Sequence, residues 1–333
     1  MSAGTVSATQ PPHAALAPRA AARGPRRARP LAAACLGLVL LCLASPAARA
    51  QTCVGNPGRD GVGSNLSGVV NTYYPGAADA AAGSTSLSLG TPVRGAAATL
   101  AVGDLLLVIQ MQDATINSTN DANYGANNGT GAGATALGSS GLFEYVVVTN
   151  VVAGGVTVRG TGTGNGLRNS YNTGAAGGGV GQQRFQVVRV PQYSSVTLSP
   201  TTPLTAVPWD GTTGGVVAID VAGALNFNGG GVNVNGLGFR GGGGRGLTGS
   251  NNTADTDYRN TAARNAHGMK GEGIAGTPRY LYDRATGTLT DTGIDGYPNG
   301  SSARGAPGNA GGGGTDGNPN GASPNGNDQN AGG

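Results

Sequence analysis

Charged and aromatic side chains are scarce in this sequence. Charged residues make up 11% of the 333 residues, aromatic residues make up 5%, and Lys270 is the single lysine. Glycine, in contrast, occurs 64 times, which is roughly three times its average share in proteins. Such a chain can build a β core in some stretches but not throughout its length. Glycine does not recur at every third position, which excludes a collagen triple helix.

The first 50 residues contain no Asp or Glu, and this absence makes the formal charge of +4 misleading. Six arginines fall within that segment. Without them, fourteen basic side chains face sixteen acidic ones, a net charge of −2. The apparent basicity therefore gives no reason to expect nucleic-acid binding.

An apolar run of fourteen residues, 31–44, follows these arginines and precedes Ala48-Arg49-Ala50. A positive region, a short apolar core and an A-x-A site predict a secretory signal peptide at residues 1–50, cleaved after Ala50. The run is shorter than the about 20 residues that a membrane span needs, so we expect no span in the mature chain. A lipoprotein is the alternative, but Cys35 and Cys42 lack a good lipobox.

Cysteine and histidine are nearly absent after the predicted cleavage site. Cys53 is then the one cysteine, so no internal disulfide can form. We expect it to be a small buried residue; an intermolecular bridge or a reactive thiol is the functional alternative. His267, the one remaining histidine, lies in a polar stretch and is expected to be solvated. The sequence has no G-x-S-x-G motif and no Cys/His cluster for zinc, so we predict no catalytic residues, cofactor or metal.

Short apolar or alternating runs with many β-branched residues predict an all-β fold. The expected strands lie at residues 69–74, 85–89, 104–112, 143–152, 156–159 and 184–198, the last one split at Pro191. Gly154-Gly155 predicts a hairpin. Two Gly/Asn-rich stretches, 113–140 and 161–181, are expected to be long surface loops.

The stretch 215–243 packs three alternating runs between glycine and asparagine breaks. It predicts either an antiparallel meander or β-solenoid-like coils in which each strand lies on the one before. We favour the coils. The coils are expected to bury one set of apolar side chains together: Val217, Ile219, Val221, Leu225, Phe227, Val232 and Val234.

Composition divides the chain into four parts. After the signal peptide at 1–50 we expect a β-rich domain at 51–243 and a Gly/Asn-rich insertion or loop region at 244–304. The tail at 305–333 has no apolar side chain larger than Ala apart from Pro, and is predicted to be disordered because it cannot offset its ordering entropy. A solenoid needs a capping end, so we expect the chain to be the N-terminal part of a longer protein.

Three glycine motifs match known sites in part. Gly236-x-Gly238-x-x-Gly241 and Gly271-x-Gly273-x-x-Gly276 fit the dinucleotide fingerprint. No helix is predicted after either, so nothing would hold a pyrophosphate. Residues 311–316 fit the start of a calcium-binding nonapeptide, but Asn318 stands where an apolar residue is needed and no second copy follows, so no calcium site is expected.

Two functional alternatives have candidate residues. A β-helix polysaccharide lyase or hydrolase would need Asp220 to converge with Arg189 or Arg240, while Glu144 is expected to point to solvent. A carbohydrate-binding module would need aromatic residues in a flat exposed row, and the residues to check are Tyr145, Tyr193 and Trp209. Trp209 is more readily interpreted as a core or lid residue.

Several stretches resemble a recurring N-terminal module of very large secreted proteins of Gram-negative bacteria. They are LSGVVNTYYPG (66–76), VGDLLLVIQMQDA (102–114), FEYVVV (143–148), FQVVRVPQYSSVTL (185–198), residues 208–242 and GEGIAGTPRYLYD (271–283). In similar proteins the module precedes tandem immunoglobulin-like conserved repeats or other surface-adhesion modules. The resemblance implies a secreted or outer-surface location and, by association, an adhesion or envelope function. It provides no catalytic residues to transfer. Export, the absence of a catalytic set and long polar loops on a β scaffold lead us to expect a non-catalytic structural or adhesion-type protein, with surface glycans or matrix as partners.

Overall fold

The structure is a computed structural model that describes residues 55–117, 133–177, 179–240, 271–283, 288–291, 293, 296–297, 313–314 and 331–332. These residues belong to one compact unit, Thr52–Gly333. Within them, regular structure is β throughout except for one 3-10 turn, η1 (Thr163–Asn165). The predicted all-β class is therefore confirmed. In the described part of the chain, no helix has the length and hydrophobicity that crossing a membrane requires.

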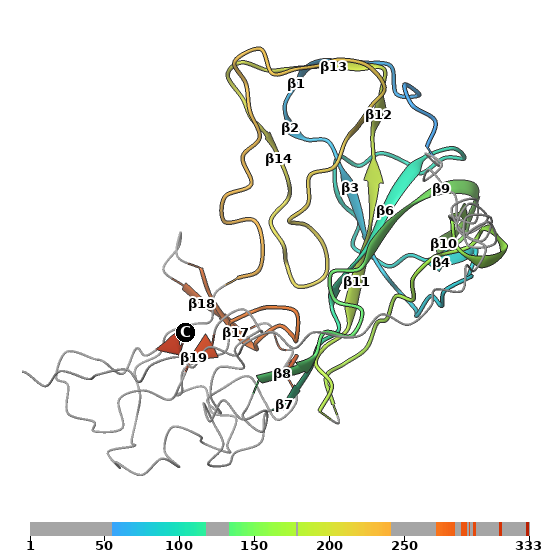
Figure 1. The fold of residues 1–333 in the computed structure, drawn as a ribbon. Helices are drawn as coiled ribbons and strands as arrows, with labels where there is room; N and C mark the ends of the chain where they lie inside the picture. The colour runs from blue at the N-terminus through green and yellow to red at the C-terminus, as the bar shows by residue number, and fades with distance from the viewer. Residues whose placement is uncertain are drawn as a thin grey trace, which may run out of the picture. The chain divides into compact units, whose positions relative to one another are not determined.

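A seven-stranded antiparallel sheet forms the centre of this unit (Figure 1). Its spatial order is β4-β10-β9-β6-β11-β3-β5. The strands are β3 (Thr72–Pro75), β4 (Ser86–Ser88), β5 (Arg94–Gly95), β6 (Leu105–Gln112), β9 (Phe143–Val152), β10 (Gly155–Arg159) and β11 (Arg184–Val190). β9 and β10 form the predicted hairpin, with Gly154 at φ +71° in its turn, a conformation that glycine adopts without strain.

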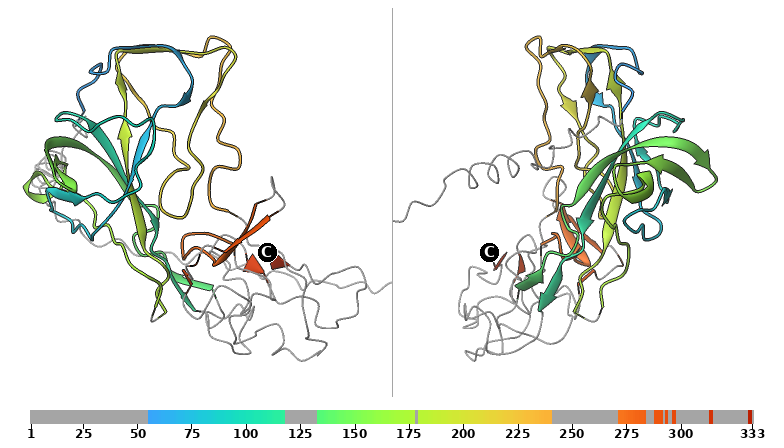
Figure 2. Two further views of the ribbon diagram at one scale, coloured as in Figure 1. Left: turned by 180° about the vertical axis from the view of Figure 1, so that it is seen from behind. Right: turned by 45° about the vertical axis from the view of Figure 1, so that its right-hand side comes forward.

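The sheet is strongly curved, as the views in Figure 2 show, and its two sides meet through backbone contacts. Gly76, just after β3, bridges to Leu89, just after β4, and Ala77 N–H donates to the Ser88 carbonyl at 3.1 Å. β4 therefore pairs with β10 on one side and with the extension of β3 on the other. Closure of this kind removes exposed strand edges.

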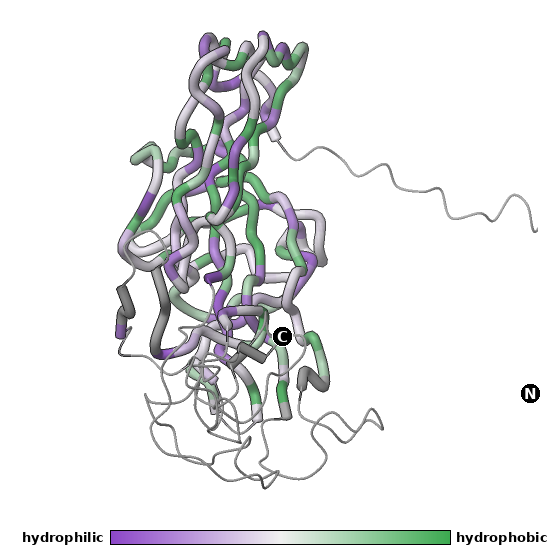
Figure 3. Tube along the Cα trace, turned by 90° about the vertical axis from the view of Figure 1, so that its left-hand side faces the viewer, coloured by the Kyte–Doolittle hydropathy of each residue, from purple (hydrophilic) through white to green (hydrophobic). Residues whose placement is uncertain are grey.

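The inside of the curled sheet holds the largest apolar cluster. Figure 3 shows hydrophobic residues recurring along these strands. The cluster consists of Tyr74, Ala80, Leu87, Leu100, Leu106, Val108, Val146, Val148, Val156, Val158, Leu167, Tyr171, Phe185 and Val187. Leu167 and Tyr171 are fully buried although they lie in the predicted surface loop 161–181. That prediction was wrong at these two residues, because their side chains complete the core beside Phe185.

The opposite face of the sheet is covered by residues 206–218. Tyr73, Leu105, Leu107, Val147, Val188 and Val190 form a second cluster with Ala206, flanked by Val207, Val216 and Val217. Hydrogen bonds from polar side chains of the sheet hold residues 206–218 in place. The Tyr73 hydroxyl donates to the Val216 carbonyl at 2.6 Å, and Gln186 exchanges two hydrogen bonds with the Gly214 backbone. β6 is accordingly buried on both faces.

Beyond one end of the sheet, three separate segments lie side by side in parallel. We call residues 60–69, 191–206 and 219–234 the first, second and third pass of the stack. The first pass contains β1 (Val62–Leu66) and β2 (Gly68–Val69); the second contains β12 (Gln192–Tyr193), β13 (Ser195–Leu198) and β14 (Leu204–Thr205); the third contains β15 (Asp220–Val221) and β16 (Leu225–Asn226). β13 lies between β1 and β16, β12 pairs with β15, and β14 pairs with β2 and bridges to Val232.

This stack corrects the expectation for residues 215–243. The three apolar runs are consecutive parts of one pass and pair with the second pass, so they neither form a meander nor lie on one another. The breaks at 222–224 and 228–231 act as corners, and Asn228 and Gly229 adopt positive φ there. Three passes with strands of two to five residues do not make a regular solenoid.

The predicted joint burial of this stretch was also wrong. Leu225, Phe227, Val232 and Val234 are 42 to 51% exposed. Val217, Ile219 and Val221 are half-buried. The side chains of the third pass stay exposed because, among the described residues, a neighbouring pass lies on one side of it and none on the other.

Shorter elements complete the described part. β7 (Thr115–Asn117) pairs with β8 (Gly133–Ala136), β17 (Tyr280–Asp283) with β18 (Thr288–Asp291), and β19 (Gly313–Gly314) with β20 (Ala331–Gly332). β7 and β8 correct the expectation of a surface loop at the two described ends of 113–140, while residues 118–132 lie outside the described residues. Ile274 and Ala275 pack with Ala114 and Ile116, so residues beyond 243 contribute to the core of this unit.

Candidate functional site

Asp220, Arg189 and Arg240 do not converge. Arg189 places its Nη2 atom 2.8 Å from Asp60 Oδ1 and 3.0 Å from Asp104 Oδ1. Burial acts to lower the pKa of Arg189, but its hydrogen bonds and charge interactions with Asp104 and Asp60 outweigh this and raise it. The guanidinium is thus held charged between two carboxylates, and it joins the first pass of the stack to the sheet.

Asp220 reaches this cluster only indirectly. The Gln192 side-chain amide lies 3.4 Å from Asp220 Oδ2, and the Gln192 backbone N–H donates to Asp60 Oδ2 at 2.7 Å. Arg240 pairs instead with Glu272. The carboxylate and arginine set that a polysaccharide lyase or hydrolase would need is therefore not assembled by these three residues.

Glu144 is buried, not solvated as expected from its place in an alternating strand. Its carboxylate accepts hydrogen bonds from the backbone N–H groups of Arg168 and Asn169 and from the Tyr171 hydroxyl at 3.1 Å. The residue is 6% exposed. Its donors come from a chain segment that crosses the inside of the sheet, so Glu144 has a structural role in fixing that segment.

The three aromatic residues proposed for carbohydrate binding do not form a flat row. Trp209 is 2% exposed, as expected for a core residue, and its ring packs edge-on against Phe239 with centroids 5.7 Å apart. Tyr193 is half-buried on β12, whereas Tyr145 is on β9 of the sheet. Tyr145 instead lies 6.4 Å from Phe143, which is 58% exposed.

The glycine motifs do not form ligand sites in the described residues. In the described residues no helix follows Gly276, and Glu272 within that motif is engaged with Arg240 and Thr277. Gly241 of the first motif and the residues after it lie outside the described part of the chain. No group of three or more potential metal-ligating side chains occurs in the part of the chain that the structure describes. Cys53, His267 and most of the calcium-like motif at 311–316 lie outside the described residues.

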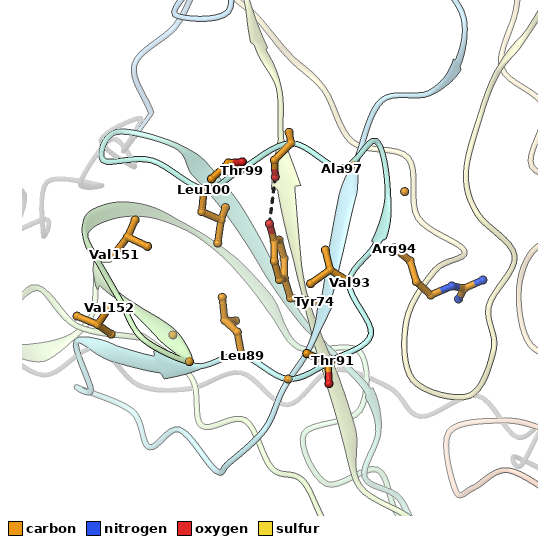
Figure 4. Close-up of a pocket in the computed structure, with 15 residues that line it drawn as sticks. Tyr74, Leu89, Thr91, Val93, Arg94, Ala97, Thr99, Leu100, Val151 and Val152 are labelled. Atoms are coloured by element: carbon orange, nitrogen blue, oxygen red, sulfur yellow. Dashed lines mark hydrogen bonds between the residues drawn. The ribbon is translucent and has the colours of Figure 1, made fainter.

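An apolar cavity of about 560 Å³ opens between the β4–β5 connection and the β9–β10 turn (Figure 4). Its lining includes Tyr74, Leu89, Val93, Leu100, Val151 and Val152. The Tyr74 hydroxyl donates to the Ala98 carbonyl at 3.1 Å, and burial raises the pKa of this phenol. Arg94 at the rim pairs with Asp210 at 2.9 Å. The cavity therefore offers apolar surface but no assembled acid and base for catalysis.

A second apolar feature is the open end of the stack, which we define as the outer side of the third pass. Paired residues of adjacent strands point to the same face. Val196 and Leu204 of the second pass are each 1% exposed, yet their partners Leu225 and Val232 are 42% and 50% exposed. The third-pass residues thus face the interior of the stack, but no further described pass covers them.

The same relation holds at two neighbouring positions. Leu198 and Phe227 each follow the Thr197–Asn226 pair by one residue; the first is 1% exposed and the second 51%. Ala206 and Val234 follow the Leu204–Val232 pair by two residues, with exposures of 3% and 43%. Four rows of apolar side chains therefore run from the second pass to the third. Their members in the second pass are buried, whereas their members in the third pass are exposed to solvent.

The sequence pattern identified the side chains of this site, but it did not show that they lie at an uncovered end of the stack. Alternation predicts which residues share a face, and it selected Leu225, Phe227, Val232 and Val234. It cannot show whether another layer lies over that face. Comparison of the chain with protein-family models, curated proteins and solved structures found no match.

Proposed function

We propose that this protein is a secreted or cell-surface structural protein of the adhesion type, without catalytic activity. The open end of the stack is the observation that carries the proposal. An enzyme needs a concave site with convergent polar groups, whereas a structural module needs surfaces on which further β structure can be added. Four aligned apolar rows at the end of a parallel stack fit the second requirement.

Two features of the sequence support the location. Residues 1–50 have the three parts of a secretory signal peptide, and the stretches quoted above resemble N-terminal modules of large surface proteins of Gram-negative bacteria. In this proposal the three passes form the beginning of solenoid-like coils, since each pass repeats the parallel register of the one before. Surface glycans or matrix are the proposed partners. The alternative of a polysaccharide lyase or hydrolase has less support, because Asp220, Arg189 and Arg240 belong to different contacts.

Export can be tested directly. The chain, carrying a C-terminal epitope tag, is produced in a Gram-negative host, and the N-terminus of the product is read by intact mass. We expect cleavage after Ala50 and digestion of the tagged chain by protease added to intact cells. A matched chain lacking residues 31–44 should keep its N-terminus and stay protected. Retention of residues 1–50 by the unaltered chain, with protection from protease, would contradict the proposal.

Binding is tested separately with residues 51–333 on a glycan array and on immobilised matrix proteins. Binding that survives Asp220→Asn fits a non-catalytic module. Shortening of a bound polysaccharide, followed by size-exclusion chromatography and lost in the same variant, would instead favour the enzyme.

A further inference from the structure

Among the residues that the structure describes, the backbone of the third pass is paired along one side only. Ala222 N–H donates to the Tyr193 carbonyl, Val196 N–H donates to the Ala224 carbonyl, and Asn233 N–H donates to the Leu204 carbonyl, each at 2.9 Å. In a parallel strand, successive residues direct their N–H and C=O groups to opposite sides. Val221, Leu225 and Val232 therefore direct theirs outward, where the described residues place no strand.

This edge also lacks the usual protection against pairing. Exposed edge strands generally carry charged side chains or proline, which discourage the addition of another strand. From Val221 to Phe239 the sequence contains no charged residue and no proline. The open end of the stack thus combines exposed apolar side chains with backbone groups that no described strand pairs, and it presents no electrostatic barrier.

The sequence that directly follows the third pass contains no alternating apolar run suited to cover this end. Between 241 and 270 the apolar side chains larger than Ala are Leu247, Tyr258 and Met269, which are too far apart to alternate. The later apolar residues have other partners, because Ile274 packs on the Ala114 cluster and β17 pairs with β18. The apolar run 31–44 is removed under the proposed function, and in this respect the inference rests on that proposal.

We propose that a second copy of this chain covers the open end of the stack. In a two-fold interface the same surface meets itself, so Leu225, Phe227, Val232 and Val234 of one copy pack against the same residues of the other. An edge with like charges would repel its own copy, whereas this uncharged edge does not. The outward backbone groups of the two third passes then pair across the two-fold axis.

The test is the oligomeric state of the purified full chain after export, with its N-terminus confirmed by intact mass. Sedimentation and light scattering over a concentration series should show a dimer. Leu225→Lys and Val232→Lys each place like charges face to face, and should weaken dimerisation by about tenfold or more. Val102→Lys is the matched control: Val102 is 60% exposed and precedes β6, outside the third pass. It should leave the dimer unchanged.

Circular dichroism melts establish that each variant folds. Val232→Thr, which is nearly isosteric and uncharged, is included in case both lysine variants unfold, and it should weaken the dimer to a smaller extent. A wild-type chain that stays monomeric over the whole series overturns the inference, as does a dimer that folded lysine and threonine variants leave unchanged. The N-terminal mass and the protease accessibility report on export, whereas sedimentation reports on dimerisation. A failure of the proposed function can therefore be distinguished from a failure of the dimer inference.

Discussion

Arg240 and Glu272 form a two-point ion pair that joins the chain just beyond the third pass to the segment beginning at 271. Arg240 Nε and Nη2 each lie 2.8 Å from one carboxylate oxygen of Glu272. Their backbones are also paired, with Glu272 N–H donating to the Arg240 carbonyl at 2.9 Å. Glu272 is 1% exposed and also accepts from the Thr277 hydroxyl. The pair therefore anchors residues 271–277 against the sheet unit.

Removal of the two partners should have unequal effects. Arg240→Ala leaves a buried carboxylate without its cation and should lower the free energy of unfolding by about 3 kcal/mol. Glu272→Gln leaves an arginine that reaches solvent and should lower it by about 1–2 kcal/mol. Urea unfolding measures both. Arg159→Ala, at an exposed position on β10, is the control and should change stability by no more than about 0.5 kcal/mol. Equal losses for the two partners would contradict this account.

The Phe185 ring of β11, packed over Gly76, predicts a strict size limit at that glycine. A Cβ atom added there would overlap the Phe185 ring, which belongs to the inner core. Gly76→Ala should therefore lower the free energy of unfolding by about 1–3 kcal/mol through overpacking. At Gly231 an added Cβ meets nothing within 4 Å, so Gly231→Ala is the matched control. Thermal unfolding compares the two, and equal melting temperatures would show that the Phe185 ring does not pack over Gly76 as described.

The sheet was more predictable than the stack, for a physical reason. β6, β9, β10 and β11 are long and rich in Val, Ile and Leu, and their signal is local. The stack depends on pairs such as Val196 with Leu225 and Leu66 with Leu198, in strands as short as two residues. Alternation gives the face of such residues but not their neighbours, because the first and second passes are separated by more than a hundred residues of sequence. Glu144 and Tyr171 were missed because a buried carboxylate is specified by donors from another segment, here the backbone N–H groups at 168 and 169.

Asn71 should hold the start of the third pass onto the sheet. Its side-chain amide donates to the carbonyls of Arg189 and Ala218, at 3.0 and 2.6 Å, and its oxygen accepts from Ala218 N–H at 3.0 Å. Asn71→Ala removes all three hydrogen bonds and should lower the free energy of unfolding by about 1–3 kcal/mol. Hydrogen exchange at Ala218 should accelerate more than exchange within β9. Uniform acceleration across both segments would indicate a general loss of stability in place of local release.

Tyr73 should make the protein sensitive to alkaline pH. The residue is fully buried, and burial raises its pKa from 10.0 to about 12. Because the folded-state pKa is the higher one, this contribution to stability is complete below pH 10 and is lost as pH rises from 10 towards 12. Two pKa units correspond to about 2–3 kcal/mol. Tyr73→Phe loses the hydrogen bond to the Val216 carbonyl, so at pH 8 the variant should be less stable than wild type by about 1 kcal/mol. The phenylalanine variant does not ionise at this position, so the difference should shrink or reverse by pH 11. Urea titrations at pH 8 and pH 11 measure it, and a constant difference between the two proteins would show that Tyr73 is not the buried phenol that senses pH.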